Sequence, residues 1–246
     1  MRYFRQSPEV WMKTGQSPVS EADYAVDRFL RETLLAARPD YGWLSEETVD
    51  TGERLGARRT FVVDPIDGTR GFLEGKVVWC VSIAVVEDGR PIVGVLECPA
   101  RGETFRAEAG RGALKNDVAL AIRPVGDSPE IAGPKAMLDA LPLPLRDAIR
   151  RHRYVPSLAY RIAMIADGAL DATFVKSNSQ DWDLAAADLI LHEAGGAIRD
   201  ERGSRLTYGG RETKHGALVA GSGKLLDTMA AVIAADSRNG SESARF

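Results

Sequence analysis

Apolar and polar positions alternate along the chain with two different periods, and each period predicts its own elements. From Ser20 to about Ala37, apolar residues recur every three or four positions, which is the spacing of one helix face. Ser20 with Asp23 resembles a capping box, and Pro39 would end the helix. The first long element is therefore predicted to be a helix over residues 20–37.

Shorter apolar runs predict strands in the first half of the chain. The run Arg59–Val63 should end at Asp64-Pro65, because proline donates no ladder hydrogen bond and disfavours a helical conformation at the residue before it. Asp88-Gly89 lies between two apolar runs and is a strong hairpin signal. We expect strands near residues 41–45, 59–63, 78–86, 91–97, 103–107 and 118–122.

The pattern changes beyond Pro124, where four prolines interrupt the chain before strands alternate with longer helical segments. Residues 157–167 and 181–194 have helical patterns, the second closed by Gly195-Gly196. Residues 169–175 and 217–220 are strand-like, and a last helix follows. We therefore predict an N-terminal α+β half, residues 1–125, and a C-terminal α/β half, residues 126–246.

Composition narrows the class of protein. The 246 residues are 44% hydrophobic and 27% charged, which excludes a fibre, a disordered tail and a mini-protein. The net charge of −3 argues against a nucleic-acid partner. No run approaches the ~20 apolar residues of a membrane span, and no signal core follows the N-terminus, so we expect a cytoplasmic protein. Cys80 and Cys98 lie in apolar runs, as reduced buried thiols do.

The candidate chemistry centres on Asp64-Pro65-Ile66-Asp67-Gly68-Thr69, which directly follows a predicted buried strand. Carboxylates at the carboxyl end of a strand lie where α/β proteins hold ligands, and oxygen ligands in a rigid turn suit Mg²⁺. Gly68 permits close backbone approach, so the amides of Gly68 and Thr69 could hold an anionic oxygen. Taken alone, these residues favour a plain turn over a metal site, since they are turn formers.

Two other acidic segments have both functional and ordinary interpretations. Glu46-Glu47 follows a predicted strand, where a pair of acids is common in a solvated loop. Asp183 lies at the start of a predicted helix, where the helix dipole alone favours a negative charge by roughly 0.3–1 kcal/mol. Neither segment indicates a metal site by itself.

Taken together, these motifs resemble the inositol monophosphatase family of Mg²⁺-dependent, lithium-sensitive phosphomonoesterases. The resemblance rests on Glu46-Glu47, Asp64–Thr69, Trp182–Ala187 and Glu193–Gly196, in that order, with supporting matches at Lys13 and Ser17–Asp23. It covers most of the chain. It implies an α/β fold of alternating helix and sheet layers, α-β-α-β-α, with the site in the crevice between the two halves.

The resemblance also implies a set of metal ligands. Glu46, Asp64 and the backbone carbonyl of Ile66 would bind one Mg²⁺, and Asp64, Asp67 and Asp183 a second. A third ion near Glu47 would bring the number to three. Such a cluster needs cations, because two carboxylates ~4 Å apart repel by about 4 kcal/mol at an effective dielectric of 20.

For catalysis, we expect a metal-bound water, oriented by Thr69 and deprotonated with help from Glu46, to attack phosphorus in line. Asp67 would act in catalysis as a ligand of the second metal, and that metal would stabilise the leaving oxygen. The amides of Gly68 and Thr69 would hold the phosphoryl oxygens, and Asp183 would also touch the substrate. No covalent phosphoenzyme is required.

The substrate contacts depart from the inositol phosphatase pattern. Arg70-Gly71-Phe72-Leu73 looks more similar to the 3′(2′),5′-bisphosphate nucleotidase branch, and Lys176 replaces an acid that would contact a sugar hydroxyl. A cation there suits a second phosphate, although Arg70, Lys176 and Arg161 could each be a solvated surface charge. We favour a bisphosphate nucleotide such as 3′-phosphoadenosine 5′-phosphate over inositol monophosphate.

The family resemblance leaves two wider expectations. The partner would be a small phosphorylated metabolite and the protein a homodimer, with no membrane association. The alternative from another class is a non-catalytic regulatory or RNA-associated protein that kept the fold, which the complete set of acids argues against.

Overall fold

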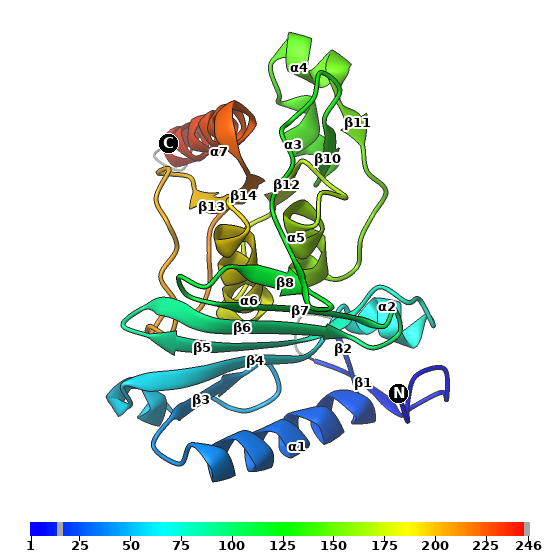
Figure 1. The fold of residues 1–246 in the computed structure, drawn as a ribbon. Coiled ribbons are helices and arrows are strands. Elements are labelled where there is room, and N and C mark those ends of the chain that lie inside the picture. Colours follow the sequence, from blue (N-terminus) through cyan, green and yellow to red (C-terminus); the bar gives the residue numbers. More distant parts are fainter. Residues whose placement is uncertain (14–16, 244–246) are drawn as a thin grey trace.

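Helices and sheets alternate in five layers (Figure 1). The structure, a computed structural model, describes residues 1–13 and 17–243. Helix α1 (Glu21–Ala37) covers one face of a seven-stranded sheet, and α5 (Leu158–Ala166) and α6 (Asp181–Glu193) fill the space between this sheet and a five-stranded one. Helix α7 (Gly223–Ser243) covers the far face of the second sheet. The expected layered α-β-α-β-α fold is confirmed.

The larger sheet is built from consecutive segments of the first half of the chain. Its strands, in spatial order, are β3 (Gly42–Ser45), β4 (Arg59–Asp67), β5 (Cys80–Glu87), β6 (Arg90–Cys98), β7 (Glu103–Glu108), β8 (Ala113–Lys115) and β9 (Val118–Ala119). β3 and β4 are parallel and the other neighbours antiparallel. Asp88 and Gly89 both have positive φ angles, 50° and 75°, as a tight hairpin between twisted strands requires.

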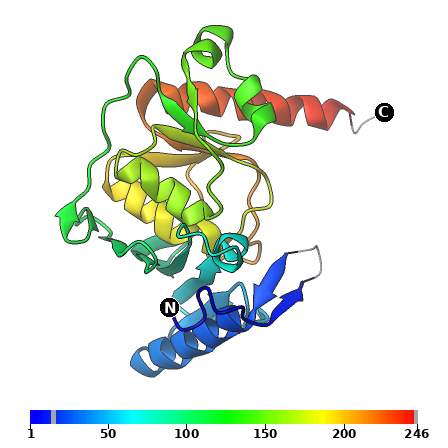
Figure 2. The same cartoon turned by 90° about the vertical axis from the view of Figure 1, so that its right-hand side faces the viewer.

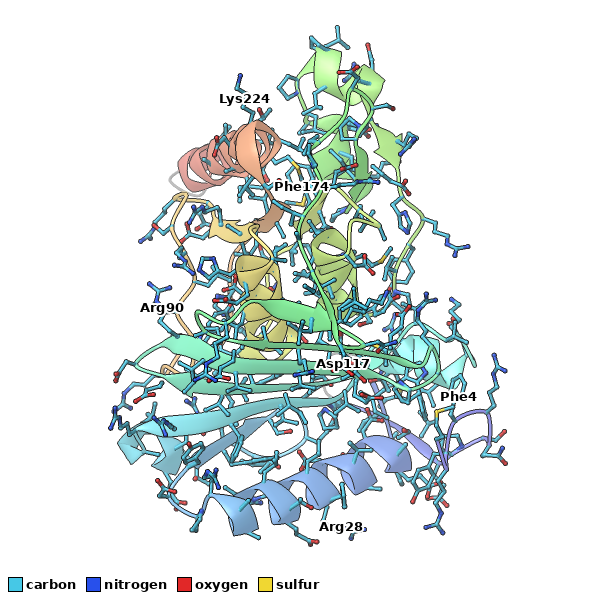
Figure 3. The ribbon with its side chains drawn as sticks, viewed as in Figure 1. Phe4, Arg28, Arg90, Asp117, Phe174 and Lys224 are labelled. Carbon is cyan, nitrogen blue, oxygen red and sulfur yellow. The ribbon has the colours of Figure 1, made fainter. Side chains whose placement is uncertain are left out.

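The smaller sheet is mixed and draws on segments far apart in sequence. Its spatial order is β11 (Arg150–Arg151), β10 (Glu130–Ala132), β12 (Ala172–Val175), β14 (Leu218–Gly221) and β13 (Ala197–Asp200). Phe174 of β12 is fully buried, and Figure 3 shows it inside the upper part of the molecule. Arg28, in contrast, is exposed on the outward face of α1 (Figure 3). This sheet therefore has its own apolar core against α7.

Helix α6 lies at the centre of the molecule because its sequence allows close packing. Leu184 and the alanine run Ala185–Ala187 are fully buried. Opposite them, a Cβ added to Gly94 of β6 would lie 2.8 Å from the carbonyl oxygen of Ala186. Small residues on both sides let helix and sheet approach closely and fix where the first turn of α6 lies.

The remaining elements are short. An N-terminal hairpin pairs β1 (Val10–Met12) with β2 (Pro18–Ser20), and the connection between the two sheets runs along the outside of the molecule (Figure 2). The short helices are η1 (Glu53–Gly56), α2 (Thr69–Leu73), α3 (Lys135–Asp139) and α4 (Leu143–Ala148). Within the described ranges, no helix combines the length and apolar character needed to cross a membrane. The division at residue 125 stays a prediction.

Several predicted boundaries are wrong. The strand expected to stop at Asp64-Pro65 continues to Asp67, with its pairing to β5 interrupted between Asp64 and Asp67, so Pro65 is tolerated in an irregularity. The strand expected over residues 118–122 covers only Val118–Ala119. The sequence pattern does not predict strands β1, β2, β8, β10, β11 and β13, because short strands carry too few residues to show a period.

Candidate active site

Three aspartates meet where β4 ends and α6 begins. Asp64 and Asp67 are at the carboxyl end of β4, and Asp183 is in the first turn of α6. One carboxylate oxygen from each lies within 4.8 Å of the other two. Asp64 and Asp67 are buried and Asp183 is half-buried. The structure thus brings together two motifs that are more than a hundred residues apart.

The irregular end of β4 directs the first two carboxylates. The Oδ1 atom of Asp64 accepts the backbone N–H of Ile66 at 3.0 Å, which closes a local turn around Pro65. Gly68 follows with φ of +93°, and a Cβ there would lie 3.2 Å from the Cα atom of Ser157. Glycine is needed at this position both for its left-handed conformation and for the close approach of α5.

Asp67 is held by the first turn of α5. Its carboxylate accepts the backbone N–H groups of Leu158 at 3.1 Å and Ala159 at 2.7 Å, together with the hydroxyl of Ser157. The Ser157 hydroxyl also accepts the N–H of Tyr160 at 3.0 Å and so caps the same helix. The Asp67 side chain is therefore fixed before any ligand arrives.

The charges of the cluster are poorly compensated by the protein. Burial raises the pKa of Asp64 well above its usual range, and the neighbouring carboxylates of Glu46, Asp67 and Asp183 raise it further. Burial and the charge of Asp67 raise the pKa of Asp183 in the same way. No salt bridge reaches the three aspartates from the described residues. The three carboxylates therefore need a bound cation, or protonation, to balance their negative charges.

Glu46 and Glu47 lie at the same site but share a lysine. The Lys13 Nζ atom is 2.9 Å from Glu46 and 2.6 Å from Glu47. Burial raises the pKa of Glu47 to about 7, although Lys13 opposes this. Glu46 lines the pocket of the three aspartates, whereas the Glu47 side chain is buried against Lys13.

Thr69 has a partner that sequence reasoning missed. Its hydroxyl lies 3.2 Å from Oδ1 of Asp23 and 3.1 Å from the carbonyl oxygen of Ile66. Asp23 also caps α1, accepting the N–H and hydroxyl of Ser20 at 2.8 and 2.6 Å. The capping pattern identified Asp23 as a helix residue, and nothing in the sequence indicates its second contact, 46 positions away.

The remaining predicted residues line two adjoining cavities. A pocket of about 170 Å³ is lined by the acidic residues and by Ile66, Gly68, Thr69 and Arg70. A cavity of about 840 Å³ opens beside it and is lined by Lys176 and Arg161. The two cavities share Ser17, Tyr154, Pro156 and Asp183. Arg70 therefore lies beside the aspartates, and Lys176 lies farther out, exposed in the larger cavity.

The donor set fits Mg²⁺. This ion prefers hard oxygen ligands. The site offers carboxylates, and its described lining residues include no histidine, cysteine or methionine that could act as a nitrogen or sulfur ligand. The raised pKa values of the aspartates show that their negative charges are unbalanced in the protein alone. A divalent ion would remove that imbalance and restore all three as ionised ligands.

Comparison with known proteins identifies the relatives of this chain. A model described as the inositol monophosphatase family matches residues 2–239. The chain is 32% identical to the 3′(2′),5′-bisphosphate nucleotidase CysQ of Aggregatibacter actinomycetemcomitans, over 86% of this chain and 82% of that protein. It is 31% identical to the inositol-1-monophosphatase of Rhizobium meliloti, over 93% and 87%. The solved structure of a Thermotoga maritima IMPase superposes with a TM-score of 0.82 at 25% identity, covering 97% of this chain and 92% of that one.

Proposed function

Because the chain belongs to the inositol monophosphatase family, whose members are metal-dependent phosphatases, we propose that it hydrolyses a small phosphate monoester with Mg²⁺ held by Asp64, Asp67 and Asp183. The observation that carries the proposal is the convergence of these carboxylates within 4.8 Å. A merely structural cluster would be neutralised by neighbouring basic side chains, and among the described residues no salt bridge reaches these three aspartates.

We assign the ligands in two groups that share one residue. Glu46, Asp64 and the carbonyl of Ile66 would hold one ion, and Asp64, Asp67 and Asp183 the other. All five residues line one pocket, which supports the assignment. A third ion at Glu47 would have to displace the ammonium of Lys13, so we favour two ions in the working state.

When bound, Mg²⁺ would supply charge neutralisation and Lewis-acid activation of water. The protein groups would orient the water, accept its proton and hold the substrate. Thr69, restrained by Asp23 and Ile66, would orient the attacking water, and Glu46 would accept its proton. The backbone amides of Gly68 and Thr69 would hold phosphoryl oxygens, and Asp183, which lines the same pocket, would also touch the substrate.

For the substrate we propose a bisphosphate nucleotide such as 3′-phosphoadenosine 5′-phosphate, with inositol 1-phosphate as the alternative. Arg70 lines the pocket of the aspartates, and Lys176 lines the larger cavity, where a second phosphate could extend. Tyr154 lines both cavities and is 74% exposed, so its ring offers a face for a base. Inositol carries no such planar group.

Phosphate release from both substrates and from a generic aryl phosphate, with and without Mg²⁺, tests the function. We expect Mg²⁺-dependent turnover by the wild-type chain, and its loss by at least about 100-fold in Asp67→Asn and Asp183→Asn. Folded variants that retained normal turnover would refute the assigned site. A wild-type chain inactive on every ester would favour a binding role. The ratio of kcat/KM for the two natural substrates decides between them.

We also propose a homodimer that is inhibited by lithium, as the family resemblance implies. Sedimentation velocity on the purified chain tests the first property. Titration of Li⁺ into the Mg²⁺-dependent assay tests the second.

A further inference from the structure

We propose that Asp27 of α1 is a positioning residue of the metal site, because it accepts a hydrogen bond on each side of the pair Glu46-Glu47 and so holds the segment that carries them. This inference rests on the proposed metal-dependent function and deepens it. It assigns to the site a carboxylate that would bind no ion itself and would act through its neighbours.

The two carboxylate oxygens of Asp27 contact the two residues that flank the glutamates. Oδ1 accepts the hydroxyl of Ser45, and Oδ2 accepts the hydroxyl of Thr48 at 2.7 Å. Asp27 and Ser45 are buried, so water competes little for these bonds. One side chain thus fixes the chain on both sides of Glu46 and Glu47.

The segment leaves the sheet directly after Ser45, where β3 ends. The N–H of Glu46 still donates to the carbonyl of Val63 at 3.2 Å, but Glu47 and Thr48 make no backbone–backbone hydrogen bond with the described residues. Lys13 pairs with the two glutamate carboxylates and not with the backbone that carries them. The course of the backbone at Glu47 and Thr48 therefore depends on side-chain contacts.

Neighbouring donors direct both hydroxyls towards Asp27. The Thr48 hydroxyl accepts the indole N–H of Trp43 at 3.2 Å, which leaves its own proton for Asp27. The Ser45 hydroxyl lies 3.4 Å from the backbone nitrogen of Glu47, from which it accepts while it donates to Asp27. A carboxylate has an acceptor oxygen for each hydroxyl, whereas an asparagine would place an NH₂ group against one of them.

The burial of Asp27 makes these two contacts important. In the part of the chain that the structure describes, its side-chain partners are the two hydroxyls and no cation. A buried carboxylate without an ion pair is costly, and hydrogen bonds to the charged form offset that cost. The carboxylate therefore ties the segment firmly to α1.

Helix α1, which lies along β3 and β4 in Figure 1, also sets a spacing within the pocket. Asp23, which contacts Thr69, precedes Asp27 by four residues on the buried face of α1, about 6 Å along the helix axis. One rigid helix thus restrains both Thr69, assigned to orient the water, and the segment of Glu46, assigned to accept its proton. Loosening Glu46 should weaken Mg²⁺ binding more than substrate binding.

Calorimetric titration of Mg²⁺ into metal-free protein tests the inference without turnover. We expect Asp27→Asn to bind Mg²⁺ at least about tenfold more weakly than the wild type, because contacts behind a metal ligand contribute about 10- to 100-fold to affinity. Glu46→Gln, which removes the ligand itself, should be weakened at least as much. In the phosphatase assay, the Mg²⁺ concentration for half-maximal rate should rise by the same factor, whereas KM for the ester at saturating Mg²⁺ should stay within about twofold.

Removing the hydroxyls separates positioning from charge. Ser45→Ala and Thr48→Ala keep the charge of Asp27 and should each weaken Mg²⁺ binding by about 3- to 30-fold, whereas Thr48→Ser should retain most of the affinity. Adding Thr48→Ala to Asp27→Asn should weaken binding by less than about threefold more, since both changes remove the same contact. Wild-type Mg²⁺ affinity in both alanine variants would mean that Asp27 acts only through its charge, and this overturns the positioning role. These variants also carry the test if Asp27→Asn folds poorly.

Asp171→Asn is the matched control for the loss of a buried carboxylate. Asp171 accepts hydrogen bonds from Arg123 and from the backbone N–H of Glu130, and it does not line the pocket of the aspartates. This variant should unfold at a lower urea concentration and keep the wild-type Mg²⁺ affinity. Equal weakening of Mg²⁺ binding in Asp171→Asn and Asp27→Asn would show a general loss of packing and overturns the inference.

The outcomes distinguish failure of this inference from failure of the proposed function. A wild-type chain that binds no Mg²⁺ refutes the proposed function and the inference with it. A wild-type chain that binds Mg²⁺ and hydrolyses a phosphate ester, with an Asp27→Asn variant whose Mg²⁺ affinity is within about twofold of the wild type, refutes the inference alone.

Discussion

The hydroxyl of Ser157 donates a hydrogen bond to the carboxylate of Asp67 across 90 positions of sequence. This contact joins the carboxyl end of β4 to the first turn of α5. It gives a proposed metal ligand a fixed orientation before an ion binds, as outer contacts of metal sites do.

The Ser157–Asp67 contact predicts that Ser157→Ala weakens Mg²⁺ affinity and kcat/KM about 10- to 100-fold, because Asp67 loses an orienting donor. The variant should also unfold about 1 kcal/mol more easily, since α5 loses its cap. Mg²⁺-dependent activity and urea unfolding measure the two effects.

Ser157→Thr, which keeps the hydroxyl, should recover most of both. Ser128→Ala, an exposed hydroxyl bonded to Ala148, is the matched control. Normal Mg²⁺ affinity in Ser157→Ala would contradict the orienting role.

The uncompensated charge of the cluster predicts opposite effects of Asp64→Asn with and without metal. In EDTA the variant should be more stable than the wild type by about 1–3 kcal/mol, because a buried carboxylate among like charges is removed. Stabilisation by Mg²⁺ should largely disappear, since binding to the native state is lost. Thermal unfolding in EDTA and in Mg²⁺ measures both. Asp117→Asn, which changes an exposed acid in the turn between β8 and β9, should keep the full Mg²⁺ response. An Asp64→Asn protein that Mg²⁺ stabilises normally would exclude Asp64 as a ligand.

The close approach of Gly68 to Ser157 predicts a large effect of Gly68→Ala. The added Cβ meets the backbone of Ser157 at 3.2 Å in a left-handed conformation, so β4 and α5 must separate slightly. We expect a loss of about 1–3 kcal/mol in stability and more than about tenfold in kcat/KM. Gly112→Ala isolates the conformational strain, because Gly112 has a φ of +80° and no atom within 4 Å of an added Cβ. Equal losses in the two variants would show that crowding against α5 does not matter.

Glu103 predicts a pH-dependent contribution to stability away from the site. Burial raises its pKa, but hydrogen bonds from Arg101, Tyr160 and Lys115 outweigh this and lower it to about 2. A lowered folded-state pKa means that the stabilisation is complete above the unfolded value near 4.5 and is lost as the pH falls towards 2. Glu103→Gln should therefore cost about 1–2 kcal/mol at pH 7, after solvent screening, and progressively less below about pH 4.5.

Urea unfolding of the wild type and Glu103→Gln between about pH 7 and pH 3 measures this dependence. Glu108→Gln, which removes an exposed acid paired with Arg111, should show little change at any pH. A Glu103→Gln difference that stayed constant with pH would mean that the carboxylate charge is not the source of the stabilisation.

The parts of the fold that follow from local sequence were predictable. The helical period and capping residues around Ser20 and Asp23 give α1 within one residue of its start. Asp88-Gly89 gives the hairpin between β5 and β6. The irregular end of β4 was predicted only in part, because the proline rule stops the strand at Asp64 whereas the surrounding sheet carries it to Asp67. Local rules fail where neighbouring strands supply the missing hydrogen bonds.

The sequence by itself determined the acidic motifs, the family they resemble and the type of cation they suit, because these depend on residue type and order. Only the tertiary structure decided which groups restrain them. The contacts of Ser157 with Asp67 and of Asp23 with Thr69, and the position of Lys13 between Glu46 and Glu47, join segments that no period connects. The burial of the Arg161 Nε atom was equally invisible in the sequence, because a charged residue on a helix is ordinarily solvated and only the tertiary packing around α5 decides which of its atoms lose contact with water.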